Sequence, residues 1–167
     1  MTAVEKLKSV ANEAYSLYPN SCSHAVWHVI KQYIPDRVYV TANPLLLYLE
    51  CDPRWKRVKV DELEKYANEG LLIIGGLAET PNGHVVVVYP GKAKMAGGYQ
   101  FTQGGKVQTV RARGPYALVM SRSMGNWPGG MSKGDKTVLD PWGSNEKFSK
   151  VRFWRFDPSV KNLSAPC

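Results

Sequence analysis

Apolar residues recur at helical spacing near the start of the chain. They would share one face of a helix and are Val4, Leu7, Val10, Ala11, Ala14 and Leu17. Thr2 followed by Glu5 fits a capping box, in which a hydroxyl and a carboxylate satisfy the first free backbone N–H groups. The pattern therefore predicts an amphipathic helix over residues 3–17.

A second helix is predicted directly after a proline turn. Pro19 ends the first run, and Asn20 or Ser21 can cap a helix that covers about residues 22–33. The first or second residue of that helix is then Cys22.

The two sides of this second helix differ in character. At about 100° per residue, Cys22 lies on the side of Val26 and Val29, at the edge of the core, whereas His24 and His28 lie near the opposite side. The histidines have the i, i+4 spacing of a helical zinc pair, but Cys22 points away from them and no second ligand cluster is in view. We therefore expect a polar, partly exposed histidine face, with no metal and no other cofactor.

Two shorter helices follow. Asn43 and Pro44 open an apolar one, and Asp61 with Glu64 makes a second capping box. Gly70 is placed as the C-terminal stop of that helix.

After residue 70 the pattern changes to continuous apolar runs. Four of them read as strands: "LLIIGG" (71–76), "HVVVVY" (84–89), "YALVMS" (116–121) and "VRFWRF" (151–156), with "ETPNG" as a turn. Runs without alternation indicate strands that are covered on both faces. The expected fold class is α+β, with N-terminal helices packed on an antiparallel sheet.

Composition adds limits to this picture. With 167 residues, 44% apolar and 22% charged, residues 1–167 are expected to form a single domain that needs no disulfide or metal to fold. The N-terminus has no apolar signal region, and no apolar run approaches the roughly 18 residues of a membrane span. We expect a protein made in the cytoplasm without a signal peptide and without membrane insertion. Function outside the cytoplasm would then need an export route other than a cleaved signal.

The net charge of +8 indicates either an acidic partner or simple solubility. A nucleic-acid-binding module is one alternative, because basic and aromatic residues alternate in "RWKRVKV" (54–60) and "KVRFWRF" (150–156). The same alternation is typical of any amphipathic strand, so we expect no nucleic acid.

The candidate chemistry starts from a thiol. Three cysteines cannot all pair within one chain, and although Cys51 and Cys167 could form a pair, at least one thiol stays free. Cys22 opens a helix, where unpaired N–H groups and the helix dipole favour the thiolate. We expect this position to lower its pKa.

A partner for that thiol is offered by His84. It follows the turn glycine and opens an apolar strand, so its side chain can project from the end of the sheet toward a helix terminus. A cysteine on a helix start and a histidine on a strand start can give the pair used in covalent amide hydrolysis. By spacing alone, a buried inert cysteine and a structural histidine fit the same residues.

The two stretches together resemble a known family. "NSCSHAVWHVI" followed by "EGLLIIGGLAETPNGHVVVVYPG" is similar to the Cys and His signatures of papain-like cell-wall amidases, the NlpC and CHAP group, and within it to the type VI secretion amidase effectors. The resemblance covers roughly residues 18–90. It implies a papain-like (NlpC-like) fold, with Cys22 as nucleophile, His84 as general base and the Cys22 backbone N–H as an oxyanion donor.

The resemblance also implies a substrate and a setting. The substrate would be an amide next to diaminopimelate in a bacterial peptidoglycan stem peptide, such as the D-alanine to diaminopimelate cross-link. The protein would be an antibacterial effector acting in the periplasm of a target bacterium, with a cognate immunity protein in the producing cell. Another papain-like hydrolase or acyltransferase, acting on a protein or lipid, would share the same cysteine and histidine.

The third catalytic position, which would orient the imidazole, is open. In the papain-like layout it lies on the strand after the histidine strand, which offers Ser121, Ser123 or Asn126, with Asp140 as a carboxylate outside that strand. We rank Ser121 first.

Two long connections complete the analysis. Residues 92–115, rich in Gly, Lys and Arg, could be an inserted hairpin that shapes specificity or a disordered surface turn. Residues 123–144 form a connection in which Trp127 and Trp142 could line a substrate groove or only pack the loop down.

Overall fold

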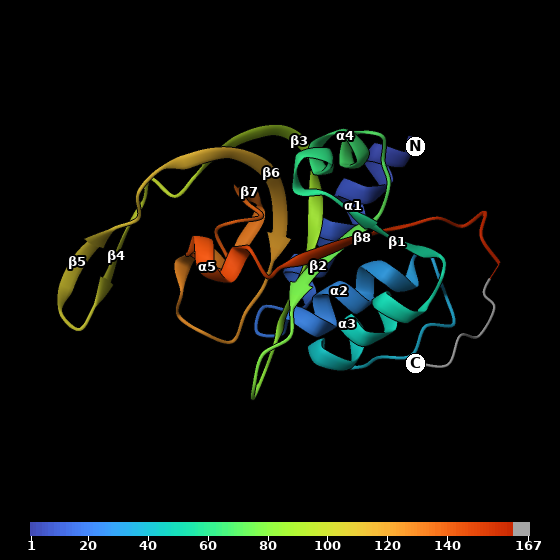
Figure 1. Ribbon diagram of the computed structural model, residues 1–167, viewed down its shortest axis with the longest axis horizontal. Helices are drawn as coiled ribbons and strands as arrows, with labels where there is room; N and C mark the ends of the chain where they lie inside the picture. Colours follow the sequence, from blue (N-terminus) through green and yellow to red (C-terminus); the bar gives the residue numbers. More distant parts are fainter. Residues whose placement is uncertain (162–167) are drawn as a thin grey trace.

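The computed structural model, which describes residues 1–161, has the α+β architecture that the sequence predicts. Its main sheet has six antiparallel strands in the order β1-β8-β2-β3-β6-β7, and a separate two-stranded hairpin is formed by β4 and β5 (Figure 1). The strands are β1 (Trp55–Val58), β2 (Ile73–Leu77), β3 (His84–Ala96), β4 (Gln100–Gln103), β5 (Lys106–Thr109), β6 (Arg113–Ser121), β7 (Ser132–Thr137) and β8 (Arg152–Phe156). The α-helices of the described chain are α1 (Ala3–Leu17), α2 (Cys22–Lys31), α3 (Ala42–Cys51), α4 (Leu63–Asn68) and α5 (Asn145–Phe148).

The first two helices begin where the local sequence predicts. The Thr2 hydroxyl accepts from the Glu5 N–H at 3.1 Å and the Glu5 carboxylate accepts from the Thr2 N–H at 2.8 Å, which is the predicted capping box of α1. Ser21, one of the two candidates, caps α2, and its hydroxyl accepts from the His24 N–H at 3.2 Å. The helix runs to Lys31, two residues short of the predicted end.

The sheet is covered on both faces, as its continuous apolar runs predict. Along β3, Val85 and Val87 belong to a core shared with α1, α2 and α3, whereas Val86 and Val88 belong to a second core shared with α4 and β6. All four valines are fully buried. Two covered faces hold β3 firmly, and its first residue is His84.

The second predicted capping box is wrong. A turn of 3₁₀ helix (Val60–Glu62) precedes α4, and the Glu62 carboxylate, not that of Glu64, accepts from a preceding backbone N–H, that of Lys59. Glu64 instead accepts from the Ala93 N–H of β3. Gly70 does follow the helix end, with a φ of +82°.

The open question about residues 92–115 is answered by an inserted hairpin. β3 and β6 continue past the sheet, and β4 and β5 form an arm at their far end (Figure 1). The edge strands β1 and β7 were not predicted. No helix within residues 1–161 combines the length and apolar character needed to cross a bilayer.

Candidate active site

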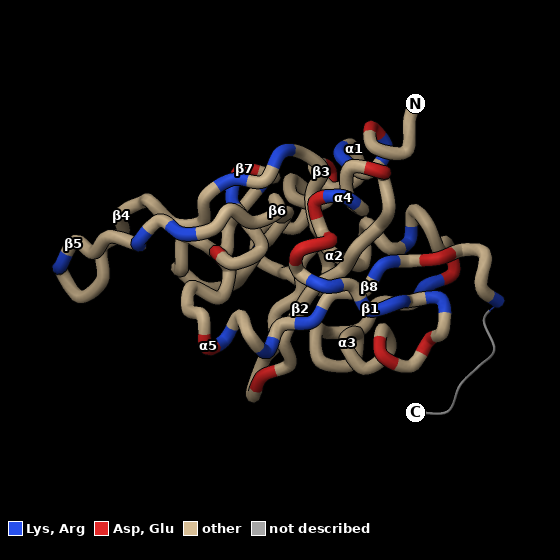
Figure 2. Tube along the Cα trace, turned by 45° about the horizontal axis from the view of Figure 1, so that its top comes forward, with Lys and Arg blue, Asp and Glu red and all other residues tan. Residues whose placement is uncertain are grey.

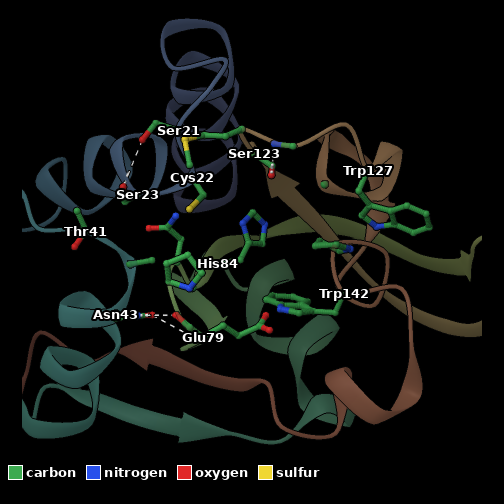
Figure 3. A pocket seen from close by; sticks show the side chains of 18 of the residues that line it. Ser21, Cys22, Ser23, Thr41, Asn43, Glu79, His84, Ser123, Trp127 and Trp142 are labelled. Atoms are coloured by element: carbon green, nitrogen blue, oxygen red, sulfur yellow. Dashed lines mark hydrogen bonds between the residues drawn. The ribbon is translucent and has the colours of Figure 1, made fainter. Parts of the chain in front are cut away.

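A pocket of about 420 Å³ lies where the start of α2, the start of β3 and the loops after β2 and β6 come together (Figure 3). Cys22 and His84 both line it. The fold therefore brings to one pocket the two residues that the sequence selects, Cys22 and His84, which are 62 positions apart in the chain.

Cys22 is the first residue of α2 and is partly buried. Burial raises the pKa of its thiol, and this outweighs the lowering by the backbone N–H groups of Val85, Ser23 and Cys22 itself. The expectation of a lowered thiol pKa is therefore wrong. The N–H groups at the helix start lower the pKa of the thiol, as expected, but the loss of hydration on burial raises it by more.

His84 is the first residue of β3 and pairs in register with Leu77 of β2. Its Nε2 lies 2.9 Å from the Ser121 hydroxyl oxygen, and that hydroxyl donates its single proton to the Gly130 carbonyl at 2.8 Å. Because the hydroxyl proton is already used, Nε2 must be the donor in its contact with Ser121. The neutral ring then carries its lone pair on Nδ1, the nitrogen that can act as a base.

The surroundings of His84 keep the imidazole neutral. Burial lowers its pKa to about 4, and the Trp142 ring packs edge-on against it at a centroid distance of 5.5 Å. Ser121, its hydrogen-bond partner, carries no charge that would stabilise an imidazolium. Both shifts favour the uncharged forms of the two groups, a thiol and a neutral imidazole, over a thiolate–imidazolium pair.

The other three candidates for the third position do not contact the His84 ring by a hydrogen bond that the structure records. Ser123 lines the pocket and its hydroxyl accepts from the Gly125 N–H at 3.2 Å. Asn126 is exposed on the loop between β6 and β7. Asp140 is buried and is occupied with structural bonds to the base of the arm and the end of β7.

The helical histidine pair is not arranged as a metal site. His24 stacks on Tyr39 at 3.8 Å and its Nδ1 contacts the Ser21 hydroxyl at 2.7 Å. His28 is buried, and its Nε2 lies 3.0 Å from a Glu13 carboxylate oxygen, so the prediction of a partly exposed face is wrong at this position. Within residues 1–161 there is no group of three or more side chains of metal-ligand type.

One residue that sequence reasoning read only as a helix opener fixes the loop before His84. The Asn43 side chain donates to the Glu79 carbonyl at 2.9 Å and accepts from the Glu79 N–H at 3.3 Å (Figure 3). Its Oδ1 also lies so close to Gly83 that a Cβ there would come within 2.2 Å of it. An asparagine at a helix start is a common local signal, and nothing in the sequence shows that it reaches this loop.

The predicted connection over residues 123–144 is interrupted by β7, and the segments before and after this strand supply the opposite rim. Trp127 and Trp142 both line the pocket, which favours the groove interpretation, and the Trp127 indole N–H donates to the Asp140 carbonyl at 2.7 Å. Phe101 of the arm packs edge-on against Trp127 at 5.0 Å. The inserted hairpin therefore packs against the Trp127 side of this rim.

The two basic and aromatic stretches lie side by side as β1 and β8, where Figure 2 shows several Lys and Arg residues. Their four aromatic residues are buried: Trp55, Trp154 and Phe156 belong to the core shared with α1, α2 and α3, and Phe153 belongs to the second core. Bases cannot stack on buried rings, so this surface lacks the aromatic platform of single-strand binders.

Comparison with the models of known protein families and with curated proteins finds no match for this chain.

Proposed function

We propose that this protein is a papain-like cysteine amidase that hydrolyses an amide bond in bacterial peptidoglycan stem peptides. The observation that carries the proposal is the shared pocket of Cys22 and His84, with Ser121 bonded to Nε2 of the imidazole. The proposed nucleophile and base line one pocket from α2 and β3, and the proposed orienting group lies buried behind the imidazole at the end of β6.

In the first step the Cys22 sulfur attacks the amide carbonyl carbon while His84 Nδ1 takes the thiol proton. The neutral resting pair suits this concerted route, because no thiolate has to exist beforehand. The resulting oxyanion is stabilised by the Cys22 backbone N–H at the start of α2. Ser121 holds the ring through Nε2 while Nδ1 carries the proton.

In the second step His84 gives that proton to the departing amine, the C–N bond breaks and an acyl-thioester remains on Cys22. A water molecule then attacks the thioester carbonyl, and Nδ1 accepts one of its protons. Breakage of the S–C bond releases the acid, and the proton returns from His84 to the sulfur. The enzyme is thereby restored.

The substrate proposal rests on charge and on the resemblance of the Cys and His stretches to effector amidases. Stem peptides carry several carboxylates, and the chain has a net charge of +8. The proposed bond is the D-alanine to diaminopimelate cross-link. We propose that the protein acts as an antibacterial effector in the periplasm of a target cell and is held in check by an immunity protein.

Digestion of purified sacculi by the wild-type chain and by Cys22→Ala tests the proposal. Mass spectrometry should show new amine termini at one stem bond with the wild-type chain and none with the variant. A chain that leaves both cross-linked and monomeric stems intact would rule the function out. Transfer of the acyl group to an added amine, in place of water, would favour the acyltransferase alternative.

A further inference from the structure

Two opposite charges face each other at the wall of the pocket. A Glu79 carboxylate oxygen lies 3.3 Å from the Lys147 ammonium nitrogen, and both residues line the pocket that holds Cys22. Among the described residues that line this pocket, Glu79 supplies the one carboxylate and Lys147 the one ammonium group. Neither is used by the hydrolytic steps.

The backbones of both residues are held by hydrogen bonds from neighbouring side chains. Glu79 is held at its N–H and its carbonyl by the Asn43 side chain. Lys147 is the third residue of α5, and its N–H donates to the Ser144 hydroxyl at 3.2 Å. The side chains themselves are 35% and 54% exposed, so a ligand can reach both charges.

The geometry points to a subsite for a zwitterionic α-amino acid centre, in which Glu79 binds the ammonium and Lys147 binds the carboxylate. A free α-amino acid carries its two charges on one carbon atom, and the two protein charges are likewise adjacent. A ligand with a single charge would leave one member of the pair without its partner. A zwitterion replaces one ion pair with two charge-assisted contacts.

The inference rests on the proposed function for the identity of the ligand. In an uncross-linked stem, and in the donor stem of a cross-linked dimer, the side chain of diaminopimelate ends in a free ammonium and a free carboxylate on one carbon. In the donor stem this residue immediately precedes the D-alanine whose carbonyl Cys22 would attack. Glu79 and Lys147 would therefore select stems in which this centre is unmodified.

The alternative is an ion pair that only ties α5 to the loop before His84. Exposed pairs of this kind contribute little to stability. The two interpretations predict different effects of removing one charge. At a subsite the change alters the discrimination between ligands, whereas in a purely structural ion pair it changes the affinity for all ligands by the same factor.

The test measures binding to the inactive Cys22→Ala chain by calorimetry, so that it does not depend on turnover. The probes are the tetrapeptide L-Ala-γ-D-Glu-diaminopimelate-D-Ala, the same peptide with the side-chain carboxylate of diaminopimelate amidated, and the same peptide with its side-chain amine acetylated. Each modified probe should bind about tenfold more weakly than the free one. Lys147→Met should bind the free and amidated probes equally, and Glu79→Gln should bind the free and acetylated probes equally.

Matched controls carry the same charge changes outside the pocket. Lys150→Met and Glu146→Gln alter exposed residues next to α5 and within it, and both should keep the full discrimination. Equal affinity for the three probes, loss of affinity for all of them by one factor in Lys147→Met, or no binding of any probe would overturn the inference. If sacculi are cleaved but the three probes bind equally well, only the subsite inference fails. If the probes are discriminated but no cleavage depends on Cys22, only the proposed function fails.

Discussion

The Nε2 atom of His84 and the hydroxyl of Ser121 are joined at 2.9 Å, and the direction of this bond determines which ring nitrogen is the base. The Ser121 proton goes to the Gly130 carbonyl, so the ring donates and Nδ1 keeps its lone pair. A serine can orient the imidazole in this way, but it cannot stabilise a positive ring as a carboxylate would. The same contact therefore explains both the tautomer and the neutrality of the base.

Replacing Ser121 with alanine should lower kcat by about tenfold or more with little change in KM, because the ring loses the partner that fixes its tautomer. The change also leaves the buried Gly130 carbonyl without its donor, at a cost of about 1–3 kcal/mol in the free energy of unfolding. Steady-state kinetics and urea unfolding measure the two effects. Ser123→Ala is the matched control, because Ser123 lines the pocket without a recorded bond to His84, and it should stay close to wild type. Equal losses in the two variants would contradict the role of Ser121.

The reactivity of Cys22 should increase with pH. Because burial raises the pKa of its thiol, alkylation by iodoacetamide at pH 7 should be slower than that of a cysteine in a short peptide, and the rate should still be rising at pH 9. Mass spectrometry assigns the label to Cys22, and the same chain unfolded in urea gives the reference rate. A rate that is already constant between pH 6 and pH 7 would mean that an ion pair exists in the resting enzyme.

Local signals in the sequence predict the helices and the central strands. α1 and α2 follow from caps and apolar spacing within a few residues, and β3 follows from an uninterrupted valine run. The edge strand β7 reads "SKGDKT", which has no apolar pattern, and it forms only because β6 offers an open edge to pair with. Gly134 there has a φ of +83° and packs against Tyr89, a contact that no local pattern predicts.

The candidate site likewise contains residues that local sequence predicts and features that depend on tertiary packing. Cys22 and His84 each open an element, and an element start is visible in sequence. The choice of Ser121 among four candidates depends on the register of β6 against β3 and β7, in which Ser121 pairs with Ser132. The pKa of the thiol was wrongly predicted because burial depends on which distant segments cover the helix start. The possible pairing of Cys51 with Cys167 lies outside the described residues.

The free energy of unfolding should decrease as the pH falls through the range in which His84 titrates in the unfolded state but not in the folded one. The unfolded histidine takes up a proton as the pH falls through about 6.5, whereas the folded one does so only near pH 4, so the unfolded state binds more protons in between. The free energy of unfolding of wild type should therefore decrease relative to that of His84→Gln by at most about 3 kcal/mol between pH 6.5 and pH 4. Urea unfolding of both chains at several pH values measures the difference, in which His24 and His28 cancel. Parallel curves would mean that the folded imidazole titrates normally.

Asn43 should act as a positioning residue for the loop that leads to His84. Asn43→Ala removes the donor and the acceptor that hold Glu79, and we expect kcat/KM to fall about tenfold as the loop loosens. Asn43→Asp keeps the acceptor for the Glu79 N–H and loses the donor, so its activity should lie between wild type and Asn43→Ala. Asn126→Ala, on the exposed loop after β6, is the control and should leave activity unchanged. If Asn43→Asp is no more active than Asn43→Ala, the hydrogen bond to Glu79 does not position the loop.

Asp140 should prove structural, although its carboxylate made it a candidate for the catalytic site. Its Oδ1 accepts from the Gly97 N–H and the Tyr99 hydroxyl at the base of the arm, and its Oδ2 accepts from the N–H and hydroxyl of Thr137. Asp140→Asn places two amide protons against these donors, so the free energy of unfolding should fall by about 2–4 kcal/mol. The pH profile of Cys22 alkylation should stay unchanged in the folded protein, because Asp140 has no recorded contact with His84. Asp135→Asn changes an exposed carboxylate on β7, the strand that precedes Asp140; it is the control and should cost less than about 1 kcal/mol. Loss of activity in Asp140→Asn at unchanged stability would instead place this carboxylate in the chemistry.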